Sequence, residues 1–179
     1  ALLGDQLVTF EFAGIKSGRY ILGHRFMHRG KIKIGSPADY LPSLREAYVY
    51  ADIAERKEMV RKAITESAVS VNATVIPDEE LIDINTNLVE YPSVSLGSFD
   101  KKFLELPDEP LITAMREHQK YFALSDSKGQ LMPYFIAVNN TPVQDVAVVT
   151  TGHERVLRAR LEDAKFFFNQ DMQTPLPEL

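Results

Sequence analysis

The chain has 179 residues, of which 45% are hydrophobic and 25% charged, so it can bury a core of ordinary size. It contains no cysteine, which excludes disulfides and thiolate metal sites, and no apolar run approaches the roughly 20 residues of a membrane-spanning helix. The formal net charge is -5, whereas a free-standing nucleic-acid binder is usually basic. Total charge therefore gives no argument for nucleic acid.

The first 35 residues have the alternation of short strands. Leu7–Phe12, Tyr20–Leu22 and Lys31–Ile34 are predicted strands, and glycines interrupt them. This stretch also contains a run of bases with no acid among them. Two interpretations are open: solvated strand faces with edge lysines, or a patch that contacts a phosphate backbone. The bases are Lys16, Arg19, Arg25, Arg29, Lys31 and Lys33.

His24 and His28 lie four residues apart, which on a helix would place two metal ligands on one face. Glycines and strand patterns surround them, and no third ligand lies nearby in the sequence. A metal site is therefore not expected here.

The middle of the chain predicts helices with clear start signals. Ser36 and Pro37 open a short one. Asp52, with Glu55 three residues later, begins the longest, to about Ser70. Pro77 and Asp78 begin another that ends before Pro92.

The next segment is predicted to be mainly extended. Val94–Phe99 is a strand, and a hairpin joins residues 120–124 to 132–138 through a turn in which Gly129 can adopt a positive φ. Leu111–Glu117 is a short helix, and the β-branched run Val143–Val149 is a further strand. The hairpin requires antiparallel pairing, so the predicted fold class is α+β, a mostly antiparallel sheet packed with several helices.

Thr151–Asn169 is predicted to be the last helix, capped by Thr151 and Glu154. Three consecutive phenylalanines, 166–168, point roughly 100° apart on a helix, so at least one is expected to touch a second surface. The polar side is either solvated or a cationic edge for a phosphate or a partner acid. The bases of that edge are Arg155, Arg158 and Arg160.

No catalytic set can be assigned. The sequence lacks a phosphate-binding G-x-x-x-x-G-K-[ST] loop, a G-x-S-x-G elbow and an H-E-x-x-H pair. Glu117 precedes His118 and His153 precedes Glu154, but neighbouring side chains point in different directions and do not form a dyad. We therefore assign no catalytic or metal residue, and the nine basic residues named above are the candidates for contact with a phosphate backbone or a protein partner.

Four runs, in order along the chain, resemble signatures of one family. This family is the β subunit of bacterial tetrameric (α2β2) glycine–tRNA ligase. His153 stands where asparagine is frequent in the last signature, so no chemistry is assigned to it. The runs are GHRF at 23–26, AMREHQKYF at 114–122, LMPYFIAV at 131–138 and GHERVLRARLEDAKFFF at 152–168.

The resemblance implies a cytoplasmic protein whose partners are the α subunit, in an α2β2 tetramer, and tRNA(Gly), with no membrane. ATP, Mg²⁺ and glycine would bind the α subunit, so no cofactor is expected here. Both ends, ALLGDQ and PLPEL, resemble cuts through a longer chain. We expect residues 1–179 to be a single α+β domain from the N-terminal half of a β subunit, with 151–179 as a helix leading to the next domain. The family carries here a module likened to the B3/B4 region of phenylalanine–tRNA ligase.

Three functions remain open. The first is a non-catalytic module of the ligase that supports tRNA recognition and assembly. The second is a module that hydrolyses mischarged tRNA, although glycine is the smallest amino acid and the demand for a second sieve is weak. The third is a module that binds only protein.

Overall fold

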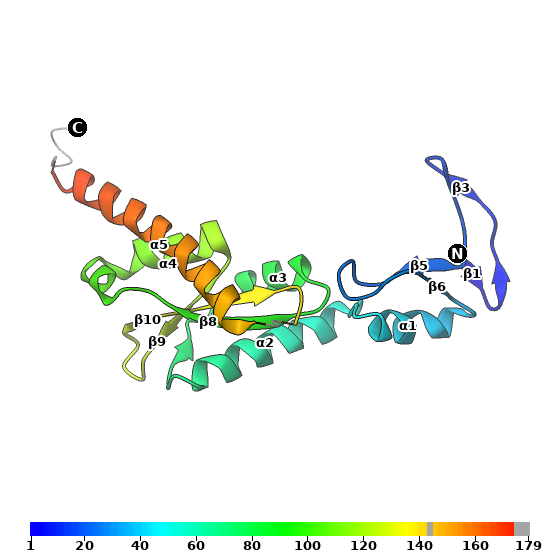
Figure 1. Ribbon diagram of the computed structural model, residues 1–179, viewed down its shortest axis with the longest axis horizontal. Coiled ribbons are helices and arrows are strands. Elements are labelled where there is room, and N and C mark those ends of the chain that lie inside the picture. The colour runs from blue at the N-terminus through cyan, green and yellow to red at the C-terminus, as the bar shows by residue number, and fades with distance from the viewer. Residues whose placement is uncertain (143–144, 174–179) are drawn as a thin grey trace.

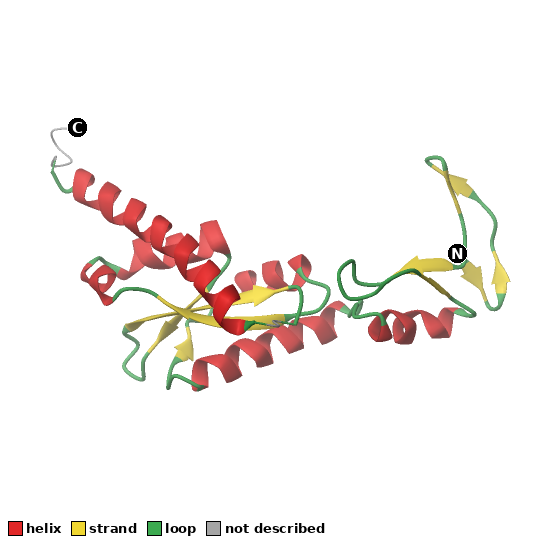
Figure 2. Ribbon diagram, viewed as in Figure 1, coloured by secondary structure: helices red, strands yellow, loops and turns green. Residues whose placement is uncertain are grey.

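The computed structural model describes residues 1–142 and 145–173. Its centre is a four-stranded sheet in the order β7 (Thr74–Val75), β9 (Phe122–Ser125), β10 (Leu131–Asn139), β8 (Ser93–Ser98). Every pairing in it is antiparallel, and helices cover both faces (Figures 1 and 2). The predicted α+β class and the strand at residues 94–99 are confirmed.

Alternation along β9 and β10 divides the core in two, because successive side chains of a strand point to opposite faces. One set packs against α2 (Ile53–Val69) and α3 (Glu79–Leu88). The other packs against α4 (Asp108–Thr113), the following π-helical turn Ala114–Gln119 and α5 (Val146–Asp171). The first set is Phe122, Leu124 and Ile136, and the second is Ala123, Phe135 and Ala137.

The predicted β9–β10 hairpin is confirmed. The Asp126 carboxylate accepts the backbone N–H groups of Lys128 and Gln130 at 2.8 and 2.9 Å, and Gly129 has a φ of 80°. Pairing with β9 shifts register between Leu131 and Phe135, the stretch that holds Pro133, whose missing N–H cannot join a ladder.

The predicted helix starts at Asp52 and Asp78 are confirmed. Asp52 accepts the N–H of Glu55 at 3.0 Å, and Asp78 accepts that of Leu81 at 2.8 Å. The predicted helix at 111–117 begins earlier, at Asp108, because a proline such as Pro110 is tolerated in the first turn of a helix. A 3-10 turn, Lys101–Glu105, precedes it.

The last helix is longer than predicted. Helix α5 begins at Val146, and its cap is Asp145, which accepts the N–H of Val148 at 3.1 Å. The predicted strand at 143–149 is therefore wrong for 146–149, where the Asp145 cap outweighs the β-branched composition; residues 143–144 lie outside the described residues. The predicted capping box is also wrong, because Thr151 lies within the helix and Glu154 instead accepts the N–H and hydroxyl of Ser98.

Residues 1–47, here called the N-terminal arm, lie to one side of the sheet (Figure 1). Three small antiparallel hairpins form most of it: β1 (Leu2–Leu3) with β2 (Gln6–Leu7), β3 (Glu11–Phe12) with β4 (Ile15–Lys16), and β5 (Tyr20–Leu22) with β6 (Lys31–Lys33). A 3-10 turn, Pro37–Asp39, leads into α1 (Tyr40–Glu46).

The predicted strand Leu7–Phe12 is thus wrong. The Ser17 hydroxyl donates to the carbonyl of Val8 and accepts the N–H of Phe10, and these bonds divide the run between two hairpins. The strands at 20–22 and 31–34 are confirmed, the second ending one residue earlier.

A buried joint connects the arm to the sheet. The His24 side chain is wholly buried, and its Nε2 lies 2.7 Å from the carbonyl oxygen of Asn140, which directly follows β10. The Asn140 side-chain oxygen accepts the N–H groups of Glu90 and Tyr91 at 2.6 and 3.1 Å, between α3 and β8. His24 is therefore a structural residue of this joint.

None of the helices in the described part of the chain has both the length and the apolar content that a bilayer span requires.

Candidate RNA- and partner-binding surfaces

The outer face of the β5–β6 hairpin combines cations with apolar side chains. Lys31 and Lys33 are two residues apart in β6 and point to the same face. Their partners across the ladder are Leu22 and Tyr20, which are 68% and 62% exposed. An exposed tyrosine ring beside ammonium groups is a combination that can stack a base and contact phosphates.

The other basic residues of the arm lie in different settings. Arg25 and Arg29 are exposed in the turn between β5 and β6, and the Arg25 guanidinium lies 5.6 Å from the centroid of the exposed Phe26 ring. Lys16 stands opposite Glu11 in the β3–β4 ladder. Arg19 is half-buried and is held against the backbone of the arm, because its guanidinium donates to the carbonyls of Asp5 and, at 2.9 Å, of Gly35.

The three arginines of α5 are exposed but lie apart from the arm. Figure 1 shows α5 over the sheet, away from the N-terminal hairpins. The two basic groups therefore do not form one surface. Arg160 is within 3.9 Å of Asp163 and lines a groove of about 550 Å³ between α4, the π-helical turn and α5. Phe167 also lines this groove, together with His118.

The three consecutive phenylalanines of α5 point in different directions around the helix, as the predicted 100° spacing requires. Phe168 packs against the core beneath the helix, whereas Phe166 and Phe167 are 58% and 62% exposed. Their two rings meet edge to face, with centroids 5.5 Å apart. These two rings therefore form an exposed aromatic pair on the outer side of the helix.

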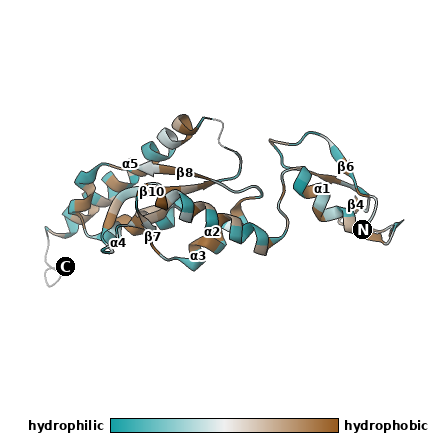
Figure 3. Cartoon of the chain, turned by 90° about the horizontal axis from the view of Figure 1, so that it is seen from below, coloured by the Kyte–Doolittle hydropathy of each residue, from teal (hydrophilic) through white to brown (hydrophobic). Residues whose placement is uncertain are grey.

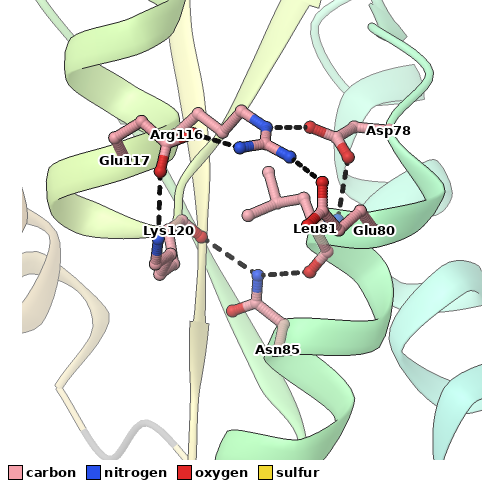
Figure 4. A network of polar contacts seen from close by, with 7 residues as sticks. All are labelled: Asp78, Glu80, Leu81, Asn85, Arg116, Glu117 and Lys120. Atoms are coloured by element: carbon pink, nitrogen blue, oxygen red, sulfur yellow. Dashed lines mark hydrogen bonds and ion pairs between the residues drawn. The ribbon is translucent and has the colours of Figure 1, made fainter.

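A clasp of charged residues joins α3 to the π-helical turn (Figure 4). Arg116 donates from Nε to Asp78 at 2.7 Å and from Nη2 to Glu80 at 2.5 Å, and its Nη1 contacts Glu117. The hydrogen bonds, led by that to Asp78, raise the pKa of Arg116. Lys120 has a left-handed φ of 58°, and its carbonyl accepts a hydrogen bond from Asn85 at 3.1 Å.

Three carboxylates thus surround one guanidinium in the AMREHQKYF run. Arg116 is therefore a structural clamp. Nothing in the sequence spacing links residues 78 and 80 to residue 116, which is why the clasp could not be predicted.

A second polar network lies beneath α5. The Tyr121 hydroxyl is 2.7 Å from Nδ1 of His153, and Nε2 of His153 is 3.0 Å from the side-chain oxygen of Asn139. Asn139 in turn donates to the Ser95 hydroxyl at 2.9 Å. Burial raises the pKa of Tyr121 to about 12 and lowers that of His153, so both groups are held neutral at pH 7.

The acids and histidines that are adjacent in the sequence have different partners in the structure. Glu117 contacts Arg116 and Lys120. His153 contacts Tyr121 and Asn139, whereas Glu154 contacts Ser98. Across residues 1–142 and 145–173, no three or more His, Asp or Glu side chains converge in a way that could hold a metal ion.

Comparison with known proteins places the chain among subunits of aminoacyl-tRNA synthetases. It belongs to the glycyl-tRNA synthetase beta subunit family, whose model matches residues 1–179. It is 52% identical over 178 residues to the glycine–tRNA ligase beta subunit of Desulforapulum autotrophicum and 51% identical over 178 to that of Desulfatibacillum aliphaticivorans. It is 45% identical over 176 residues to that of Myxococcus xanthus.

These matches cover 98–99% of this chain but only 25–26% of each relative. The chain therefore spans about a quarter of the length of the curated relatives it matches.

Proposed function

We propose that this chain is a module of a glycine–tRNA ligase beta subunit that supports recognition of tRNA(Gly) and assembly with the α subunit in an α2β2 tetramer. In that role it serves ATP- and Mg²⁺-dependent attachment of glycine in the cytoplasm, with the bond-making groups in the α subunit. Family membership supports the parent activity. The likeness to B3/B4, the single-domain organisation and the continuation of α5 into a next domain stay predictions.

One observation supports contact with RNA: the outer face of the β5–β6 hairpin. Lys31 and Lys33 share that face with the exposed Tyr20 ring, and Arg25 lies in the adjoining turn. Within the described residues, none of these three bases has an acidic side chain within ion-pair distance. Phosphates can therefore bind them without displacing an internal partner.

The test is binding of tRNA(Gly) to the chain over a range of salt concentrations. Lys31→Ala with Lys33→Ala should weaken binding most at low salt. It should also reduce the slope of log K against log salt by roughly one unit for each phosphate that the variant no longer neutralises. The matched control, Lys62→Ala with Lys128→Ala, removes the same charge from α2 and from the β9–β10 turn. It should leave the slope in place.

Other outcomes contradict the proposal. Equal weakening in both double variants would show that only net charge matters, and no binding at any salt would favour a module that binds only protein. Release of amino acid from mischarged tRNA by the chain alone would favour the hydrolytic alternative.

A further inference from the structure

The arm exposes apolar side chains out of proportion to its size. Among the described residues, ten of the twenty exposed large hydrophobic side chains belong to residues 1–47, but only three of the twenty-five buried apolar ones do. Figure 3 shows apolar segments in this part of the chain outside the main body. Such a surface is typical of an interaction site.

The exposure is extreme at the β3–β4 hairpin, residues 9–17. Phe12 and Ile15 face each other across its ladder and are 77% and 74% exposed. Its strands have two residues each. Its turn places Ala13 at a φ of 48° beside Gly14 at 76°, and a positive φ is unfavourable for alanine. A short two-stranded hairpin of this kind is marginally stable by itself in water.

The chemistry of this hairpin fits protein better than RNA. Its outermost pair joins an aromatic to an aliphatic side chain, and the neighbouring pair, Glu11 with Lys16, is neutral overall. RNA would require an excess of positive charge at the point of contact. Binding to an apolar polypeptide surface requires only that the side chains of Phe12 and Ile15 be removed from water.

The lengths of the relatives indicate which polypeptide could cover Phe12 and Ile15. Three quarters of each relative's length lies outside the region that matches this chain. Figure 1 shows the hairpin remote from the four-stranded sheet, where it can reach another part of such a subunit.

We propose that the β3–β4 hairpin is an intrachain docking element. In a beta subunit of the length of these relatives, Phe12 and Ile15 insert into an apolar surface formed by a segment outside the region that matches residues 1–179. The proposal depends on family membership and is independent of the RNA contact.

The test is hydrogen–deuterium exchange in a chimera. Residues 1–179 replace the 178 matched residues of the D. autotrophicum beta subunit, and peptides covering residues 9–17 are compared between the chimera and the isolated chain. Exchange should be at least about tenfold slower in the chimera, since docking protects the backbone amides. Peptides from β8, β9 and β10 report whether the module is folded in both samples.

Two double variants locate the effect. Phe12→Ser with Ile15→Ser should restore rapid exchange at residues 9–17 in the chimera but leave the isolated chain unchanged. Phe166→Ser with Phe167→Ser, which changes the exposed rings of α5, should leave the protection intact. Equal exchange in the chimera and the isolated chain would overturn the proposal, and so would protection that arises only when the α subunit or tRNA(Gly) is added.

Discussion

Gly97 lies opposite Phe135 in the β8–β10 ladder, and the ring of Phe135 covers it. A β-carbon on Gly97 would lie 2.3 Å from Cζ of that ring. The ring is wholly buried and stacks on Tyr121 with centroids 4.8 Å apart. Because the stack fixes the ring, the site has no space for a larger residue.

Gly97→Ala should therefore lower the free energy of unfolding by about 1–3 kcal/mol, the usual effect of overpacking a core. Gly152→Ala is the matched control. Its β-carbon would meet nothing within 4 Å, and alanine in a helix interior should raise stability by about 0.5–1 kcal/mol. Urea unfolding of both variants measures the difference. Unchanged stability in Gly97→Ala would show that the Phe135 ring can move.

His153 makes stability depend on pH. Its burial lowers its pKa below the ordinary 6.5, so the unfolded chain binds a proton at a pH where the folded chain does not. Its contribution should be complete above about pH 6.5 and be lost as the pH falls through the lowered folded pKa. His153→Asn should flatten the unfolding free energy across that window, measured by denaturant titration at several pH values. An identical slope in both proteins would contradict this assignment.

The sequence predicts local contacts of single residues better than distant ones. The apolar spacing in the last helix, with Leu157 and Leu161 four residues apart on one face, is that of a buried stripe, and both residues are buried. It does not predict the partners of His153, since Tyr121 and Asn139 are 32 and 14 residues away. The same holds for Arg116, whose partners lie in another helix.

At the scale of elements, helix starts were predicted where the cap and its recipient are close in sequence, as at Asp52 and Asp78. Helix α5 is the exception. The signature Thr151-x-x-Glu154 occurs inside the helix, because the helix already begins at the Asp145 cap, and Glu154 bonds across to Ser98 of β8. A tertiary contact thus uses the residue that the local pattern would assign to a cap.

The start of helix α5 can therefore be tested by comparing the observed cap, Asp145, with the cap that the sequence signature predicts, Thr151. Asp145→Ala should lower the free energy of unfolding by about 0.5–2 kcal/mol, the usual effect of removing an N-cap. Thr151→Ala should be neutral or slightly stabilising, because alanine has the higher propensity in a helix interior. Thermal or denaturant unfolding of the two variants makes the comparison. The reverse order would place the helix start at Thr151.

At the scale of the whole molecule, charge is divided between two parts. The arm has seven Lys and Arg residues against four Asp and Glu, whereas the rest of the chain has thirteen against twenty-one. The overall charge of -5 therefore conceals a basic arm attached to an acidic body. The sequence indicated the bases of the arm, but not that Lys16 belongs to the β3–β4 hairpin whereas Lys31 and Lys33 belong to β5–β6.

The α+β class and the central hairpin were predictable because period-two alternation and turn residues are local signals. The placement of the arm was not, since it depends on the bond between His24 and Asn140, which are 116 residues apart. The prediction for the β-branched run at 146–149 failed for a different, local reason, because the Asp145 cap one residue before it starts a helix.

The joint at His24 has a consequence for how the arm presents its surfaces. Asn140 directly follows β10, an interior strand with a core on each face, so the arm is attached to a part of the sheet that is held from both sides. If the β3–β4 hairpin docks as proposed, the docked segment lies away from the four-stranded sheet. The length of the arm between the His24 joint and that hairpin then sets the separation between the docked segment and the sheet.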